Sequence, residues 1–194
     1  TKIFTKLKLF SGDCPVNIYY KDIVLRAIEE TDLGMLKDMM NDPEIENMTG
    51  GYSYPVSSFQ QKLWFENLRN RDNEIRLIID TEEHGAIGIV MLTNIDWKNR
   101  SAQSHSKIAN GDFRGKGYGT MASTALVKYA FEELNLHCIY SHVIEYNEAS
   151  KRVREKIGFI REGILRDRIY KKGEYHNVEV WSILNKAFKN NQVK

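Results

Sequence analysis

The sequence predicts a mixed α/β domain built around one sheet of about seven strands. Strand-like segments rich in β-branched and aromatic residues come first, and strands then alternate with helices in the second half of the chain. With 194 residues, of which 42% are hydrophobic, the chain is long enough for one domain with a sizeable core.

The first elements follow an N-terminal extension, residues 1–16, which we expect to form an accessory strand or to be only partly ordered. The main domain is expected over residues 17–185, and a C-terminal tail over residues 186–194. Residues 23–28 predict the first strand of the sheet.

Two helices are predicted next. Thr31 is expected to cap the first, with Pro43 past its end, and Ser57 with Gln60 forms a capping box at the start of the second. The apolar residues expected to share one face of the first helix are Leu33, Leu36 and Met40.

The middle of the chain predicts three strands and a long helix. Residues 75–80 and 86–93 form a hairpin, and residues 102–109 form the strand that leads to a glycine-rich turn. Apolar residues at spacings of three and four predict a helix over residues 120–133, and residues 138–144 form the next strand.

The last elements are a short helix and a hairpin. The helix opens at Asn147 and stops at Gly158, and residues 168–184 are strand, glycine turn and strand. Binding residues tend to lie on loops held by a rigid scaffold, so this hairpin and the Gly- and Tyr-rich loop 47–55 are candidate substrate walls.

The glycine-rich turn is the most informative motif of the chain. It reads Arg114-Gly115-Lys116-Gly117-Tyr118-Gly119-Thr120, with a glycine at every second position directly before the predicted helix. Its backbone amides and the positive end of the helix dipole face the same point, and two basic side chains flank it. The bound group is therefore expected to be a phosphate or pyrophosphate. The spacing matches neither a Walker loop nor the dinucleotide fingerprint.

The pattern [R/Q]-x-x-G-x-[G/A] between a strand and a helix resembles the acetyl-CoA pyrophosphate loop of the GNAT (general N-acetyltransferase) superfamily. A second run, N-x-x-S at residues 147–150 followed by K-I-G-F at 156–159, resembles the second GNAT signature. The ending of the chain is similar to the branch that contains ribosomal-protein alanine, spermidine and amino-sugar N-acetyltransferases. The resemblance covers about residues 21–184.

This resemblance implies a GNAT-like fold with mostly antiparallel strands, flanking helices and a parallel pair that splays apart at the cofactor, acetyl-CoA. It makes residues 17–185 an N-acetyltransferase domain. It also implies backbone contacts from the strand before the glycine-rich turn, and an asparagine that helps to hold the pantetheine arm. The cofactor-binding residues it implies are Lys107, Ile108, Ala109, Arg114, Gly115, Lys116, Gly117, Tyr118, Gly119, Thr120, Asn147 and Ser150.

The two usual catalytic groups of the family are missing. Arg154 stands where many relatives carry a tyrosine acid, and Gln103 or Ser104 stands where others carry a glutamate base. Arg154 could stabilise a thiolate, contact a cofactor phosphate or be an ordinary exposed helix arginine, and bound water could carry the proton of the amine. The remaining candidates for proton transfer are His105, His142 and Tyr146.

The acceptor is expected to be a small amine or amino sugar, ahead of a protein N-terminus and of a polyamine. An amino sugar would use aromatic and basic loop residues, which are Tyr52, Tyr54, Arg166, Arg168 and Tyr170. A polyamine would need clustered carboxylates, for which the candidates are Glu29, Glu30, Glu44, Glu46, Glu82 and Glu83. A catalytically silent acyl-CoA-binding domain and a nucleotide-binding oxidoreductase are the alternatives from other classes.

Composition limits the partners. A formal net charge of +2 gives no reason to expect nucleic acid or an anionic membrane, and no apolar run approaches the ~20 residues of a membrane span. We expect no secretory signal and no metal ion. Of Cys14 and Cys138, the second is expected as a buried free thiol, which points to the cytoplasm. A homodimer through the C-terminal strands is also an open expectation.

Overall fold

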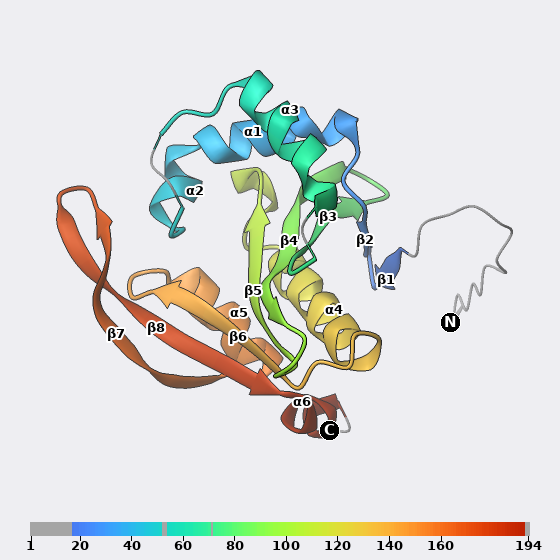
Figure 1. Cartoon of the computed structure of the whole chain (residues 1–194), viewed down its shortest axis with the longest axis vertical. Coiled ribbons are helices and arrows are strands. Elements are labelled where there is room, and N and C mark those ends of the chain that lie inside the picture. The colour runs from blue at the N-terminus through green and yellow to red at the C-terminus, as the bar shows by residue number, and fades with distance from the viewer. Residues whose placement is uncertain (1–16, 52–53, 71, 193–194) are drawn as a thin grey trace, which may run out of the picture.

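The computed structural model describes residues 17–51, 54–70 and 72–192, and these form one mixed sheet with helices on both faces (Figure 1). The strand order is β1-β2-β3-β4-β5-β6-β8-β7. The strands are β1 (Ile18–Tyr20), β2 (Ile23–Arg26), β3 (Ile75–Thr81), β4 (Gly85–Asp96), β5 (Ser101–Ile108), β6 (Cys138–Ile144), β7 (Ile160–Lys171) and β8 (Glu174–Leu184). The α-helices are α1 (Leu33–Asn41), α2 (Pro43–Asn47), α3 (Ser58–Glu66), α4 (Tyr118–Glu132), α5 (Glu148–Ile157) and α6 (Asn185–Gln192).

The sheet is antiparallel except at one place, where β5 and β6 run parallel. They pair only through Ser101 with Cys138, Ala102 with Ile139 and Gln103 with Tyr140. Beyond these pairs the two strands separate, and the Ser141 hydroxyl donates to the Ser104 carbonyl at 3.1 Å across the opening. We call this opening between β5 and β6 the fork. The mixed sheet with a splayed parallel pair confirms the fold class that the sequence predicts.

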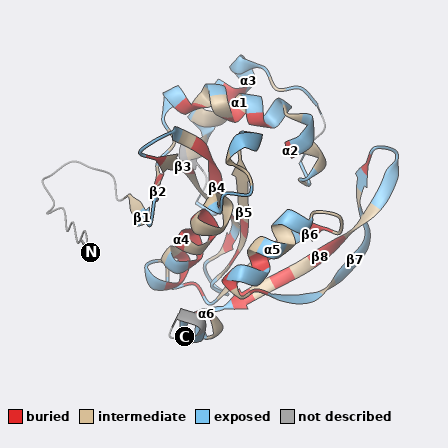
Figure 2. Ribbon diagram, turned by 180° about the vertical axis from the view of Figure 1, so that it is seen from behind, coloured by how far each residue is buried: buried red, intermediate tan, exposed pale blue. Residues whose placement is uncertain are grey.

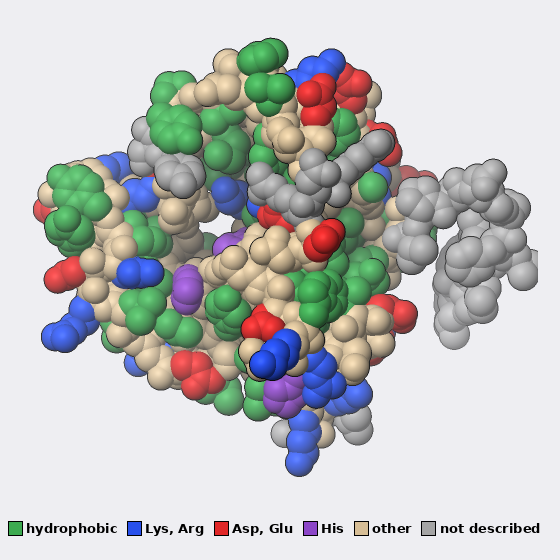
Figure 3. Space-filling model, in the orientation of Figure 1, with side chains coloured by type: hydrophobic (Ala, Val, Ile, Leu, Met, Phe, Trp, Pro, Cys, Tyr) green, Lys and Arg blue, Asp and Glu red, His purple; other side chains and the backbone are tan. Residues whose placement is uncertain are grey.

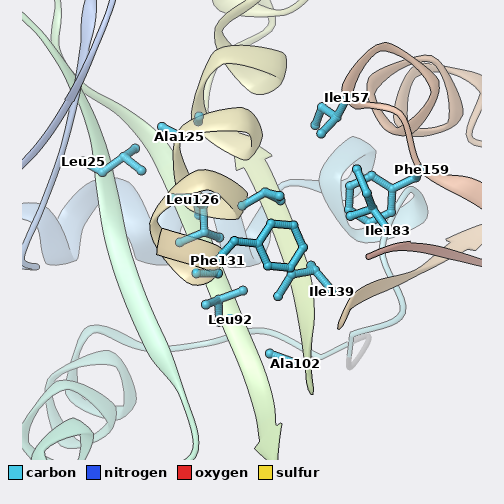
Figure 4. Packing of buried hydrophobic residues seen from close by; sticks show 14 of the residues in the cluster. Leu25, Leu92, Ala102, Ala125, Leu126, Phe131, Ile139, Ile157, Phe159 and Ile183 are labelled. Atoms are coloured by element: carbon cyan, nitrogen blue, oxygen red, sulfur yellow. The ribbon is translucent and has the colours of Figure 1, made fainter. Parts of the chain in front are cut away.

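Two hydrophobic clusters cover the two faces of the sheet. On one face α4 packs against β2, β4, β5 and β6, with Leu126 and Phe131 fully or almost fully buried against Leu92 and Ile139 (Figure 4). On the other face the helices α1 and α2 cover β3 and β4 in a smaller cluster centred on Ile78 and Ile89. The centre of the sheet is therefore covered on both faces.

One glycine lets β4 and β5 approach each other closely. A Cβ atom on Gly88 would lie 2.3 Å from the Lys107 carbonyl oxygen and 3.1 Å from the Ile108 Cα. Because both contacts are with backbone, a side chain there would displace the end of β5. Gly88 thus positions the part of β5 that borders the fork.

Several local expectations were wrong. Thr31 does not cap α1. It lies in a 3-10 turn, Glu30–Asp32, that Glu29 caps, and Asp32 is the residue before α1. Pro43 lies just past the end of α1, as expected, and it also occupies the first turn of α2, where its missing N–H costs nothing. Met39 rather than Met40 is buried.

The two ends of the sheet also differ from expectation. The strand β1 adds to the seven strands that the sequence predicts, and residues 1–16 lie outside the described residues. Residues 186–192 of the expected tail belong to α6, whose Phe188 is buried and stacks on Phe131 with ring centroids 5.6 Å apart. The buried Phe188 ring and the bonds from Asn185 to the carbonyls of Leu136 and His137 therefore fix this helix to the core.

Candidate active site

A cavity of about 1490 Å³ extends from the fork to the glycine-rich turn. Its walls come from β5 and β6, α2 and the loop that follows it, the start of α4, α5 and the β7–β8 hairpin. Figure 3 shows this face of the molecule hollowed between the hairpin and the centre, with basic and histidine side chains at the rim. Loop residues 48–51 and the hairpin line the cavity, as expected for candidate substrate walls.

The glycine-rich turn has the geometry of an anion cradle. Gly115 and Gly117 have φ of +77° and +91°, which glycine adopts without strain, and a Cβ on either would have no neighbour within 4 Å. Helix α4 begins at Tyr118, two residues earlier than expected. The backbone amide of Met121 donates to the Gly117 carbonyl at 2.9 Å, which is the first hydrogen bond of the helix. Among the residues that the structure describes, no side chain caps this end of the helix, so its first amides are available to a ligand.

The basic residues of the turn differ in their surroundings. The Arg114 guanidinium lies 2.7 Å from a Glu44 carboxylate oxygen and 3.5 Å from Asp42, both on or beside α2. Arg114 therefore ties the turn to α2 as well as adding positive charge. The ammonium of Lys116 lies over the Phe113 ring at 5.9 Å.

The backbone of β5 presents only alternate residues to the fork. The Ala109 amide donates to the Ile87 carbonyl at 2.8 Å, so this amide points toward β4 and is not available to a ligand. Residues of an antiparallel strand alternate in direction, so the Lys107 amide also faces β4, whereas the amides of Ser106 and Ile108 face the fork. Of the three amides that the resemblance implied, that of Ile108 is turned toward the fork, and the Ser106 amide is turned the same way.

Both polar atoms of the Asn147 side chain form hydrogen bonds with backbone groups of the protein. Its side-chain oxygen accepts the Ser150 amide at 3.0 Å and caps α5, and its side-chain nitrogen donates to the Met48 carbonyl at 2.9 Å. Ser150 is thus linked to Asn147 through its amide. Both residues line the cavity, and Asn147 also orders the loop that follows α2.

Three hydrogen bonds hold the end of α2 over the cavity. The Tyr146 hydroxyl donates to the Asn47 carbonyl at 2.7 Å, Asn147 donates to Met48, and the buried Lys171 ammonium donates to the Glu46 carbonyl at 2.9 Å. We call residues 46–48 with these three bonds the roof. Burial and the Glu46 charge raise the pKa of Tyr146, which makes this hydroxyl a weak acid.

The two histidine candidates face the cavity from either side of the fork. The His105 ring shares a hydrogen bond of 2.9 Å between its Nε2 and the Thr93 hydroxyl. The exposed His142 ring lies with its Nδ1 3.3 Å from the Gln103 side-chain nitrogen. Burial, followed by the positive charges of Arg154, Lys107 and Arg76, lowers the pKa of His105 to about 4. Burial and Arg168 lower the pKa of His142, so both rings are neutral at pH 7.

Arg154 is buried at the base of the fork and is not an exposed helix arginine. Its side chain is 3% exposed, its Nη1 donates to the Ser104 hydroxyl at 3.4 Å, and its guanidinium stacks on Phe159 at 5.3 Å. Its Nε has no hydrogen-bond partner, and within the described chain no carboxylate pairs with it. Burial lowers the pKa of Arg154 to about 10, so the group remains a cation at neutral pH.

These features fit a coenzyme A thioester. An uncapped helix start behind two positive-φ glycines suits the diphosphate, strand amides turned into the fork suit the acyl arm, and an unpaired guanidinium lies at its base. Parted parallel strands joined to a phosphate cradle by one cavity define an acyltransferase that takes its acyl group from coenzyme A.

The comparisons with known proteins agree with this class. The model of the family described as acetyltransferase (GNAT) domain matches residues 22–160, and the chain belongs to this family. It is an N-acetyltransferase, and acetyl-CoA is its donor.

A spermidine N(1)-acetyltransferase of Vibrio cholerae is 31% identical over 169 residues, which cover 87% of this chain and 96% of that protein. A putative ribosomal N-acetyltransferase of Bacillus subtilis is 40% identical over 101 residues, 52% of this chain and 55% of that protein. The crystal structure of the Vibrio cholerae spermidine N-acetyltransferase with CoA and spermine matches at a TM-score of 0.80 and 28% identity, over 87% of this chain and 99% of that chain.

Several residues of the cavity carried no signal in the sequence. Thr93, Ser106 and Ser141 are ordinary strand residues in the sequence, and only the register of the sheet places them at the fork. Tyr52, one of the residues suggested for an amino sugar, lies outside the described residues. In the described part of the chain, no helix combines the length and the apolar character of a membrane span.

Proposed function

We propose that this N-acetyltransferase acetylates the primary amine of a small molecule that enters between α2 and the β7–β8 hairpin. The observation that carries the proposal is the roof. Hydrogen bonds from Tyr146, Asn147 and Lys171 fix the carbonyls of residues 46–48 over the cavity. Gly50 lies so close to the Ile169 side chain that a Cβ atom added to it would be 3.2 Å from Cδ1 of Ile169. A polypeptide N-terminus needs an open groove, which these contacts narrow.

Acetyl-CoA supplies the acetyl thioester and leaves as coenzyme A. We propose that the first amides of α4 hold its diphosphate and that the Ile108 and Ser106 amides hold its acyl arm. Gly115, Lys116, Gly117, Tyr118, Gly119 and Thr120 form the cradle, with Arg114 beside it. Asn147 and Ser150 define the edge of the site through the α5 cap.

Arg154 takes the place of the missing tyrosine acid in this proposal. Its guanidinium is buried without a carboxylate, so it favours negative charge that develops at the base of the fork, on the thioester oxygen or on the departing sulfur. The neutral ring of His142 is the proposed acceptor of the proton of the amine, because a pKa of about 4 makes His105 a weak base at pH 7. Tyr146 is assigned to the roof because its hydroxyl proton is already bound to a carbonyl.

The relatives suggest two other acceptors. Three are described as spermidine N(1)-acetyltransferases, and one is described as a putative ribosomal N-acetyltransferase. Against a polyamine, three of the six carboxylates that the sequence offered are paired with lysine or arginine side chains of the protein. Glu44 pairs with Arg114, Glu46 with Lys171 and Glu30 with Lys62.

The acceptor class is tested by thiol release from acetyl-CoA with matched acceptors. The panel contains small primary amines, spermidine and a hexapeptide with an N-terminal alanine. We expect small amines to release coenzyme A and the peptide to release none above the rate of hydrolysis. Faster release with the peptide would contradict a small acceptor, and its acetylated product would identify the protein N-terminus instead.

We also propose that the enzyme works in the cytoplasm as a homodimer. The free thiol of Cys138, which is partly rather than fully buried, is consistent with a reducing compartment. The edge strand β7 carries the exposed apolar side chains Ile160, Ile164 and Leu165, which favour contact with a second copy.

A further inference from the structure

The side chain of Lys107 is a positive charge in the cavity to which the function proposed above gives no role. This residue lies on β5, lines the cavity and is only partly exposed. Among the described residues, none accepts a hydrogen bond from its ammonium group or forms an ion pair with it. Burial, with the charges of Arg76 and Lys171, lowers the pKa of Lys107. A half-buried cation without a partner is costly to the fold and points to a ligand that supplies the missing charge.

Lys107 faces the acceptor end of the cavity rather than the phosphate cradle. It is paired with Ile89 of β4, which belongs to the cluster under α1 and α2, so its side chain lies on that face of the sheet. Helix α4, whose first turn forms the cradle, packs on the opposite face. The side chain of Lys107 is thus on the same face as His105 and Arg76, at the end where the amine enters.

The charges around Lys107 are unbalanced. The other cations that line the cavity are Arg76, Arg114, Arg152, Arg154, Lys156, Arg168 and Lys172. Among them, Arg76 is neutralised by Glu74 at 2.5 Å, but the buried Arg154 has no carboxylate in the described chain. The two carboxylates that line the cavity, Glu44 and Glu148, are paired with Arg114 and Lys151.

We propose that the acceptor amine carries an anionic group, a carboxylate or a phosphate, and that Lys107 binds this group while the amine faces the fork. The proposal rests on the small-molecule function proposed above and names its substrate class. A polycation would bring further positive charge beside Lys107 and Arg154, whereas an anion would neutralise Lys107 through a charge-assisted hydrogen bond.

A matched series of amines tests the proposal. It consists of 5-aminopentanoate, 5-aminopentanamide and 1,5-diaminopentane, which share chain length and differ in the charge of the far end. Phosphoethanolamine against ethanolamine covers the phosphate case, and spermidine is added as the acceptor named for the relatives. We expect kcat/KM to be about tenfold or more higher for an anionic acceptor than for its neutral counterpart, and lowest for the diamines.

The variant Lys107→Met tests whether Lys107 binds the anionic group of the acceptor or supports the reaction of every amine. We expect it to remove the advantage of the anionic acceptors while changing kcat/KM for the neutral amines by less than about threefold and leaving the affinity for coenzyme A unchanged. Lys128→Met, on the exposed face of α4, is the control and should keep the native ranking. A preference for diamines or spermidine would overturn the proposal, as would an equal loss for all amines or weakened coenzyme A binding in Lys107→Met.

Measuring equilibrium binding of the amines tests the anion site even if none of them is acetylated. Calorimetry on the enzyme saturated with coenzyme A measures the affinity for each amine directly. If no small amine is acetylated, the small-molecule function fails, but tighter binding of the anionic amines that Lys107→Met abolishes still supports the anion site. If neither the carboxylate nor the phosphate binds more tightly than its neutral counterpart, the anion site is refuted whatever the turnover.

Discussion

At the scale of single residues, Arg154 shows how a substitution within a family motif changes the chemistry of a site. An arginine on a short helix is usually exposed, yet this one is 3% exposed and stacks on Phe159. Arg154 lies four residues before the glycine of the K-x-G-F motif, a position at which many relatives of this family are expected to carry a tyrosine, and its side chain reaches Ser104 at the fork. A fixed positive charge here can stabilise a developing negative charge but cannot supply a proton near neutral pH.

Replacing Arg154 tests its electrostatic role. We expect Arg154→Met to lower kcat by about 100-fold, the size of effect that follows loss of one oxyanion donor, while coenzyme A still binds. Arg154→Lys should recover part of kcat because it keeps the charge. Steady-state kinetics, with calorimetry for coenzyme A, measures both. Arg161→Met on the exposed part of β7 is the control, and an unchanged kcat in Arg154→Met would remove the residue from catalysis.

His105 connects the site to the acid stability of the fold. Its pKa is lowered from 6.5 to about 4, so between these values the unfolded chain binds a proton that the folded chain does not. Stability is therefore lost as pH falls from 6.5 toward 4, by at most about 3 kcal/mol. We expect the free energy of unfolding in urea to fall less between pH 7 and pH 5 in His105→Gln than in the native protein. Equal slopes would contradict this.

At the scale of elements, the site is an assembly of helix and strand ends. The start of α4, the start of α5 and the end of α2 meet at the cavity, and the fork is the end of the parallel ladder. Amides and carbonyls at such ends lack partners within their own element and are free to bind a ligand or a side chain. In the roof the carbonyls are bound by side chains, whereas the first amides of α4 have no cap.

The variant Gly117→Val tests the cradle at the start of α4. A β-branched side chain strains the positive φ of +91° and projects into space that is now open. We expect affinity for coenzyme A to fall by at least about tenfold in calorimetry. Gly85→Val is a matched control, since Gly85 also has a positive φ of +66° and open space but lies in the β3–β4 turn. Similar losses in both variants would show that strain, and not the cradle, is responsible.

At the scale of the whole molecule, the sheet has two edges of different character. Figure 2 shows most of β7 exposed, in contrast to the buried centre of the sheet and the inner face of α4. Ile160 and Ile164 on this edge are 65% and 52% exposed, respectively, although they are large apolar side chains. An exposed apolar edge strand with unpaired backbone groups favours association with another strand.

Association through β7 is tested by placing a charge on this edge. We expect the native protein to sediment as a dimer and Ile164→Lys to sediment as a monomer at micromolar concentration, with an unchanged circular dichroism spectrum. Tyr19→Lys on the opposite edge strand β1 is the control, because Tyr19 is also exposed. A dimer that persists in Ile164→Lys, or a native monomer, would exclude this interface.

The sequence by itself determined the features whose causes are local. Three such features depend on residues only a few positions apart, so the sequence pattern alone reveals them. They are the capping box at Ser57, the positive-φ glycines at the start of α4 and the asparagine cap of α5. The fold class, and the glycine-rich turn that we propose as the phosphate cradle, followed from such patterns.

Only the tertiary structure decided which charges are left without a partner. The burial of Arg154, the isolation of Lys107 and the bond from Lys171 to residue 46 join parts of the chain that lie far apart in sequence. No local pattern encodes whether a carboxylate will arrive beside a given cation, because that depends on how whole layers pack. The acceptor end of the site therefore became visible only once the sheet and its two layers of helices were in place.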